Sequence, residues 1–267
     1  MCTILILYQV HPQYPLIIAA NRDEYYARPA TSPLVLQQQP KIVGGQDQEK
    51  GGTWMAVSAA GRFAGLTNQR TGAMPDKQRK SRGAVVMSAL QAASLPEAKE
   101  HLAGLATKEY NPFSLLFGDA ESLYAAYCHE GSTRVEVEAL RPGFWVLPND
   151  VLDSPKFNKV TRAKTLLKDD LLSPWEALQP LLRSALADHE VDPKKEVFVP
   201  KGSLLPKLFW RRLEPLCIHT PVYGTRSSTI VAASRGKIEH YLFSAGAPCK
   251  TDFIEYTDLL GASSSLA

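Results

Sequence analysis

Residues that could carry out chemistry stand at the ends of the first two apolar segments of the chain. Cys2 directly follows the initiator methionine, and the apolar run over residues 15–20 ends in the four polar residues Asn21–Glu24. If Met1 is removed, Cys2 becomes N-terminal, and its own α-amine, with a pKa of about 7.7–8.0, can accept the thiol proton. The residue types therefore predict a cysteine nucleophile that needs no separate histidine. Position alone favours a small buried strand residue.

A β-hairpin would bring these two places together. Residues 3–10 and 15–20 are aliphatic and β-branched, and the turn-forming sequence HPQY separates them. The two-residue period of a strand places Arg22 on one face and Asn21 and Asp23 on the other. In a tight hairpin Arg22 would lie beside Cys2 and lower the thiol pKa, and Asp23 could hold the α-amine. The alternative is an exposed strand end with a local ion pair.

The rest of the sequence predicts strands and helices in separate groups. Strands are expected at residues 53–58, 62–68, 113–119, 122–130, 133–140, 144–148, 222–234, 237–244 and 253–259. Helices are expected at residues 81–94, 95–106, 154–172 and 173–189, the last with Ser173 as N-cap and Pro174 at the first position. Residues 25–52 are rich in Pro, Gln and Gly and predict a loop, and residues 190–221 fit no element. This segregated order is typical of an α+β fold with antiparallel sheets covered by helix pairs.

Composition excludes several classes of function. The chain has 267 residues, 45% of them hydrophobic and 21% charged, and a net charge of +3. Its densest basic run, residues 77–82, has no neighbouring aromatic residues, so a solvated loop before a helix is expected and nucleic-acid binding is not. A docking role for this loop is the weakest alternative.

Cysteine and histidine usage predicts no metal and no cofactor. The four cysteines lie far apart, without a C-x-x-C pair, and the six histidines lack ligand spacing. No disulfide framework is expected in so large a chain. The apolar start lacks the basic residues and cleavage site of a signal peptide, and no segment is long enough for an integral membrane span. We therefore expect a cytoplasmic protein.

Six separated motifs resemble one family. In order, CTILILY…NRDEYYARP, GGTWMAVSAAGRFAGLTN, SRG, NPFSLLFGD, LPNDVLDSPKFNKV and YGTRSSTIV are similar to the NRDE family, whose eukaryotic members are called transport and Golgi organisation protein 2. The resemblance runs from residue 2 to about residue 235. More remotely, the family resembles N-terminal-nucleophile hydrolases of the choloylglycine hydrolase and penicillin V acylase type. This resemblance implies a single domain over residues 1–267 with a four-layer αββα sandwich of two antiparallel sheets flanked by helices.

The resemblance also implies roles for particular residues. Arg22 matches the arginine after the hairpin, and Asn68 in GLTN offers the polar contact, displaced by Thr67. Asn149 in PND offers the oxyanion-hole amide, and Arg226 in YGTRSS matches a late arginine near the nucleophile. One departure is plain. The hydrolases place an Asp three residues after the arginine, whereas this chain has Tyr25 there and Asp23 is the nearest substitute.

Two functions follow from these expectations. The first is a cysteine amidohydrolase or acyltransferase that acts on a non-peptide amide or thioester of a small molecule through an acyl-enzyme. Cys2, Arg22, Asp23, Asn68, Asn149 and Arg226 are its expected site residues. The second is a non-catalytic carrier of haem or acyl lipid on the same scaffold. Trp54, Trp145 and Tyr223 are expected in the core or the pocket lining. Neither the acyl group nor the oligomeric state follows from the sequence.

Overall fold

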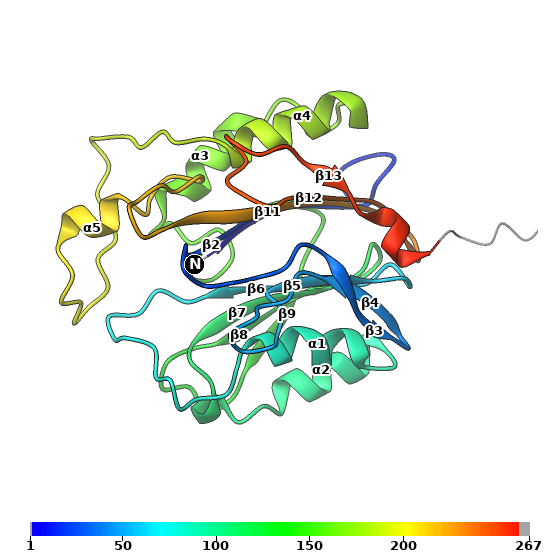
Figure 1. Ribbon diagram of the computed structural model, residues 1–267, viewed down its shortest axis with the longest axis horizontal. Helices are drawn as coiled ribbons and strands as arrows, with labels where there is room; N and C mark the ends of the chain where they lie inside the picture. Colours follow the sequence, from blue (N-terminus) through cyan, green and yellow to red (C-terminus); the bar gives the residue numbers. More distant parts are fainter. Residues whose placement is uncertain (1, 262–267) are drawn as a thin grey trace, which may run out of the picture.

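The computed structural model describes residues 2–261, which form two antiparallel sheets stacked face to face between pairs of helices (Figure 1). The first sheet has the strand order β10-β1-β2-β11-β12-β13. Its strands are β1 (Cys2–Tyr8), β2 (Leu16–Tyr25), β10 (Gly143–Leu147), β11 (Tyr223–Ser234), β12 (Lys237–Ser244) and β13 (Ile254–Glu255). We call it the six-stranded sheet. The expected α+β architecture of four αββα layers is confirmed.

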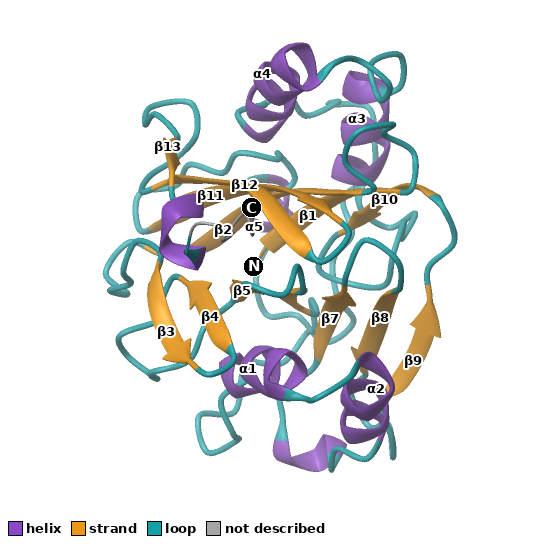
Figure 2. Ribbon diagram, turned by 90° about the vertical axis from the view of Figure 1, so that its right-hand side faces the viewer, coloured by secondary structure: helices purple, strands orange, loops and turns teal. Residues whose placement is uncertain are grey.

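The second sheet has the strand order β3-β4-β5-β6-β7-β8-β9, and we call it the seven-stranded sheet. Its strands are β3 (Leu34–Gln38), β4 (Lys41–Gly44), β5 (Met55–Ser58), β6 (Phe63–Asn68), β7 (Phe113–Gly118), β8 (Leu123–Cys128) and β9 (Glu136–Ala139). Figure 2 shows the two sheets one above the other, with helices on the outer face of each. Every neighbouring pair in both sheets is antiparallel.

Helix pairs cover the outer faces. On the seven-stranded sheet lie α1 (Gly83–Gln91) and α2 (Leu95–Ala103), and on the six-stranded sheet lie α3 (Asn158–Leu167) and α4 (Trp175–Leu186) (Figure 1). The shorter elements are α5 (Lys207–Arg211) and the 3₁₀ turns at Thr107–Glu109 and Thr257–Leu260. Within residues 2–261, none of the helices is both long and apolar enough to cross a membrane.

The apolar character of β1 and β2 follows from burial on both faces. Ile4 and Ile6 pack between the two sheets, and Leu5 and Leu7 pack against α3 and α4. Alternating side chains of one strand thus enter two different cores. This arrangement confirms the predicted buried hairpin, in which Tyr8 pairs with Leu16 near the turn.

Several predicted elements need correction. Residues 25–52 are not all loop, because β3 and β4 form a hairpin there at the edge of the seven-stranded sheet. The helix predicted over 154–172 is shorter, since α3 begins at Asn158. Ser173 is not an N-cap: Pro174 occupies that position, and α4 begins at Trp175. The last predicted strand is reduced to two residues and a 3₁₀ turn.

The two sheets touch through backbone at one end. Gly61, in the turn between β5 and β6, has φ of +75°, and a Cβ there would lie 2.6 Å from the carbonyl carbon of Gly236 in the turn between β11 and β12. Gly236 also has a positive φ. This contact lies at the end of the six-stranded sheet opposite Cys2, since β11 runs from Tyr223 beside Tyr25 to Ala233 beside Leu16.

Candidate functional site

Cys2 lies at the beginning of β1, directly opposite Arg22 of β2. Strand alternation places its side chain on the same face as Ile4, toward the space between the sheets. Cys2 is partly exposed, and it lines a cavity of about 10 Å³ together with Arg22, Trp54 and other residues. That volume holds about one water molecule. The predicted meeting of Cys2 and Arg22 at the hairpin end is therefore present.

Burial raises the pKa of the Cys2 thiol. The positive charge of Arg22 and a hydrogen bond from the Asp23 main chain lower it, but by less than burial raises it. Arg22 therefore lowers the thiol pKa as expected, but desolvation is the larger effect, so the pKa of Cys2 is raised overall. A base beside the thiol is needed to form the thiolate near neutral pH.

Arg22 is buried and fixed in place. Its Nη2 lies 3.2 Å from Oδ2 of Asp47, and its guanidinium stacks 4.3 Å above the ring of Trp54. The same Asp47 oxygen accepts a hydrogen bond from Nε of Arg28 at 2.6 Å. Burial raises the pKa of Asp47, but the bonds from Arg28 and from the Lys50 main chain lower it by more. An ionised Asp47 thus orients Arg22 beside Cys2.

Asp23 faces the helix layer instead. Its Oδ1 accepts a hydrogen bond from Oγ1 of Thr225 at 2.7 Å, and its main-chain oxygen accepts one from Oη of Tyr223 at 2.8 Å. Burial raises its pKa, and the nearby ammonium of Lys159 opposes that rise. The structure therefore places Asp23 close to the Cys2 strand end but on the face predicted from the two-residue period.

Lys159 is the main residue of the candidate site that the sequence analysis did not predict. This residue of α3 is 2% exposed, and burial lowers the pKa of its ammonium, with the charge of Asp23 acting in the opposite direction. Within the described residues 2–261 its Nζ has no hydrogen-bond partner. The spacing did indicate that Lys159 could be buried, because it precedes Val160 and lies four residues before Ala163, beside the apolar face of α3.

A second buried charge pair extends this polar region. Nη1 of Arg70 lies 3.2 Å from Oε1 of Glu214, and both side chains are 1% exposed. Nδ2 of Asn158, at the start of α3, donates to the other Glu214 oxygen. The Arg70 guanidinium also stacks on Phe157. Neither Arg70 nor Glu214 belongs to a motif singled out in the sequence analysis, so neither was predicted as a site residue.

Asn68 and Asn149 lie together, as expected, but beside the cavity rather than in it. Nδ2 of Asn149 donates to the main-chain oxygen of Asn68 at 2.9 Å, and the main-chain oxygen of Asn149 accepts from Arg70. Oδ1 of Asn149 has no hydrogen-bond partner within residues 2–261. Of the described residues, those that line the Cys2 cavity include Leu66 but neither asparagine.

Arg226 lies at an irregularity of β11. Thr225 pairs with Asp23 and Ser227 pairs with Arg22, so Arg226 is the extra residue between them. It lines a second cavity of about 50 Å³ together with Arg22 and Trp54. The two cavities thus share Arg22 and Trp54. The structure brings Arg226 to Arg22 and confirms Trp54 as pocket lining.

The sequence is similar to known proteins over most of its length. The family model described as "Transport and Golgi organisation 2" matches residues 1–242. The transport and Golgi organization protein 2 homolog of Bos taurus is 28% identical over 246 residues, which cover 86% of this chain and 88% of that protein. The human homolog is 29% identical over 247 residues with the same coverage.

Solved structures share the fold at low sequence identity. Penicillin V acylase from Agrobacterium tumefaciens has a TM-score of 0.55 at 15% identity and covers 98% of this chain and 89% of its own. The Caenorhabditis elegans ortholog of N-acylethanolamine-hydrolyzing acid amidase has a TM-score of 0.53 at 12% identity, covering 86% and 92%. A mutant of conjugated bile acid hydrolase from Clostridium perfringens has a TM-score of 0.51 at 12% identity, covering 98% and 95%.

These structural similarities show the N-terminal-nucleophile hydrolase fold, which the αββα layers display. The family match covers most of the chain and includes the Cys2 strand, the Arg22 strand end and Arg226. The chain therefore belongs to the transport and Golgi organisation 2 family.

Proposed function

We propose that, after removal of Met1, Cys2 is the nucleophile of a cysteine amidohydrolase or acyltransferase. Its substrate is a non-peptide amide or thioester of a small molecule. The observation that carries this proposal is the placement of Cys2 directly opposite Arg22 at the edge of a cavity, with Asp23 next along the same strand. The names of the structural neighbours, an acylase, an amidase and a hydrolase, agree with this chemistry.

The proposed reaction uses one residue as nucleophile and base. The free α-amine of Cys2 accepts the thiol proton, and the thiolate attacks the carbonyl carbon. The carbonyl carbon then loses its amine or thiol leaving group, which takes the proton from the α-ammonium. Water or an acceptor amine finally attacks the thioester and releases the acyl group. The raised thiol pKa is consistent with this need for an adjacent base.

The neighbouring residues act through charge and position. Asp23 holds the α-ammonium, and the buried Lys159 favours the ionised form of that carboxylate. Asn149 has two amide N–H groups, one of which is used on Asn68, so the second is the proposed oxyanion donor. Among the described residues that line the Cys2 cavity, Asn149 is absent. Substrate binding must therefore widen this cavity toward Asn149.

The second cavity supplies room for the remainder of the substrate. It adjoins Arg22 and Arg226, and its other lining residues include Thr31, Ser32 and Ser227. Guanidinium groups and hydroxyls at such a place favour a carboxylate or another anionic group. We therefore assign the charged portion of the substrate to this cavity.

Cavity size distinguishes this proposal from the carrier alternative. A pocket that encloses a drug-sized ligand has about 300–1,000 Å³. The cavities at Arg22 are about 10 and 50 Å³, so haem or an acyl lipid would need a much larger opening of this space than a small acyl group would. Titration with hemin and with a long-chain acyl-CoA tests the carrier directly, and tight stoichiometric binding of either would favour it.

Intact mass spectrometry tests the enzyme. We expect purified protein to lack Met1 and to acquire one acyl group from small chromogenic amides and thioesters. Cys2→Ala should abolish the adduct and lower turnover by more than about 10³-fold. The matched control is Cys128→Ala, which changes a buried cysteine of the other sheet and should keep both. A retained Met1, or turnover unchanged in Cys2→Ala, would exclude the mechanism.

A further inference from the structure

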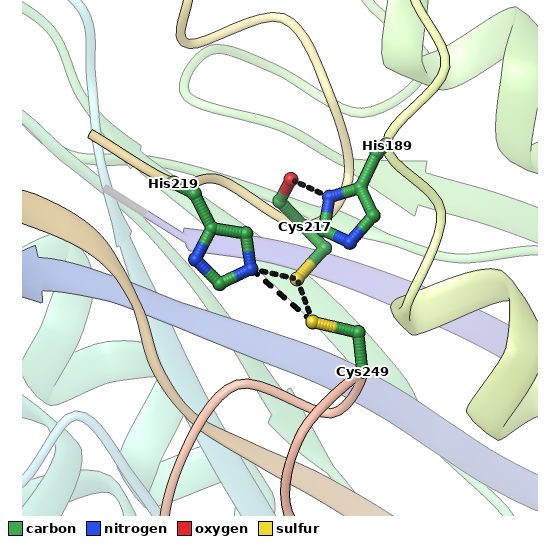
Figure 3. Close-up of side chains that lie close together, drawn as sticks. All are labelled: His189, Cys217, His219 and Cys249. Carbon is green, nitrogen blue, oxygen red and sulfur yellow. Dashed lines mark hydrogen bonds between the residues drawn. The ribbon is translucent and has the colours of Figure 1, made fainter.

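Four sulfur and nitrogen ligands gather away from the Cys2 cavity. The side chains of His189, Cys217, His219 and Cys249 each offer one ligand atom, and these atoms lie within 4.8 Å of one another (Figure 3). Cys217 is buried, and the other three are exposed at the surface, so an ion can enter from solvent. Neither Cys2 nor any other proposed catalytic residue belongs to this cluster.

Three separate segments supply the cluster. His189 follows α4, Cys217 and His219 precede β11, and Cys249 follows β12. The main chain fixes two of these segments together, because N–H of Cys217 donates to the carbonyl of Asp188 at 2.8 Å. The meeting point therefore results from the fold and not from a local sequence motif.

The distances among the ligand atoms of Cys217, His219 and Cys249 are close to those of tetrahedral coordination, and the whole set of four lies within 4.8 Å. Sγ of Cys217 lies 3.8 Å from Sγ of Cys249 and 3.7 Å from Nε2 of His219, which lies 3.2 Å from Sγ of Cys249. Bonds of about 2.3 Å to sulfur and about 2.0–2.1 Å to nitrogen at tetrahedral angles separate the ligands by about 3.3–3.8 Å. The three measured separations fall at or close to that range.

The fourth ligand is oriented by a hydrogen bond. Nδ1 of His189 lies 2.9 Å from the carbonyl oxygen of Cys217, to which it can only donate. This fixes the tautomer in which Nε2 of His189 carries a lone pair. A metal-binding histidine typically has such a bond on its other ring nitrogen.

We propose that His189, Cys217, His219 and Cys249 bind one Zn²⁺ ion in a structural Cys₂His₂ site. Each thiol releases a proton to solvent on binding, and two thiolates balance the charge of the ion. All four positions are filled by protein, so the site leaves none open for substrate. The ion would join the segment after β12 to the segment before β11.

The site would also support the start of β11. Ile218, between the two ligands Cys217 and His219, donates its N–H to Oγ1 of Thr225, and that hydroxyl donates to Asp23. A metal that fixes residues 217–219 therefore fixes the hydroxyl that contacts Asp23. This inference does not depend on the proposed enzymatic activity, because metal binding is measured directly.

Cobalt titration of the full chain under argon, in the presence of a reductant, tests the proposal. We expect one Co²⁺ per chain, with the visible bands of tetrahedral cobalt and a thiolate-to-cobalt charge-transfer band. Zn²⁺ should displace the cobalt and raise the thermal midpoint, because it binds only the folded state. Metal analysis of protein purified without chelators should find zinc at one equivalent.

Variants separate these ligands from other residues of the same type. Cys249→Ser and His219→Gln should lower cobalt affinity more than about tenfold and weaken the charge-transfer band. Cys128→Ala and His101→Gln, which lie on the other side of the molecule, should leave both unchanged. Absence of cobalt bands in reduced, natively folded wild type would overturn the proposal, as would a Cys217–Cys249 disulfide that persists in reductant.

Discussion

The two helix layers cover their sheets in different ways. Under α1 and α2 the buried side chains of the helices are apolar, with Val86 and Leu102 packed in the same cluster as Leu115 of β7. Under α3 and α4 an apolar cluster fills most of the contact, but the end nearest Cys2 buries Asn21, Asp23 and Lys159. Asn21 donates to two main-chain carbonyls and accepts from Ser228 there.

This difference shows that the layer of α3 and α4 departs from the simplest, apolar way to cover a sheet with helices. In the layer of α1 and α2, which we call the apolar layer, the two helices themselves bury only apolar side chains, whereas α3, in what we call the polar layer, buries Lys159. Transfer of a lysine or a carboxylate from water into the interior is costly. Charges that are nevertheless buried and have perturbed pKa values are often found at functional sites. The polar layer therefore supports the proposed site at Cys2.

The largest expected effect comes from breaking the buried pair of the polar layer. Glu214→Ala leaves the Arg70 guanidinium buried without its carboxylate, and we expect a loss of about 3–5 kcal/mol in the free energy of unfolding. Urea denaturation measures it. Leu102→Ala in the apolar layer should cost a similar 2–5 kcal/mol, roughly, through a cavity.

A double variant separates charge from packing. Arg70→Met combined with Glu214→Leu removes both charges and keeps apolar volume, and should recover most of the stability lost in Glu214→Ala. No such rescue is available for Leu102→Ala. If the double variant is as unstable as the single one, the pair acts through packing, and the contrast between the layers is wrong.

An intermediate effect is expected in the pH dependence of stability. Burial lowers the pKa of Lys159 from 10.5, so its contribution to stability is fully present above 10.5 and is lost as pH falls through the lowered pKa. Each unit of lowering corresponds to about 1.4 kcal/mol. Lys159→Met should therefore flatten the rise of the urea midpoint as pH increases toward about 10.5. Lys168→Met, an exposed control at the end of α3, should retain the wild-type slope.

The smallest effect belongs to a helix end of the apolar layer. Oγ of Ser94 accepts the main-chain N–H of Glu97, and Oε2 of Glu97 accepts the N–H of Ala93. Ser94→Ala should cost about 1 kcal/mol, a fall in thermal midpoint of roughly 2–4 °C. Ser173→Ala, before the uncapped α4, should change it by less than half as much. Equal effects of the two substitutions would mean that the Ser173 side chain caps α4, which it does not do in this structure.

Apolar patterning predicted the parts of the fold that are buried on two faces. The strands of residues 3–10 and 15–20 were identified because their aliphatic runs have no surface-facing positions. The hairpin of β3 and β4 was missed because its strands lie at a sheet edge, where Gln37 and Gln38 are tolerated beside solvent. The start of α4 was misplaced because Pro174 fits the N-cap position as well as the first turn.

The candidate site was predicted only where its residues adjoin a strand end. Cys2 and Arg22 meet because strand pairing brings them into register, which periodicity can anticipate, whereas Arg226, at the irregularity of β11, was predicted from the family resemblance. Lys159 and Glu214 come from helix and loop segments whose approach depends on tertiary packing. The same reason hid the Cys217 cluster, since motif searches count short spacings and its ligands span 61 positions, from His189 to Cys249.

The glycine contact between the two hairpin turns has a consequence for how a substrate reaches Cys2. Gly61 and Gly236 bring the two sheets into backbone contact at this end, and a side chain at Gly61 would push the sheets apart there. This contact closes the space between the sheets at that end, and Cys2 lies at the opposite end. A molecule that enters between the sheets at the Cys2 end therefore reaches the thiol without passing the glycine contact.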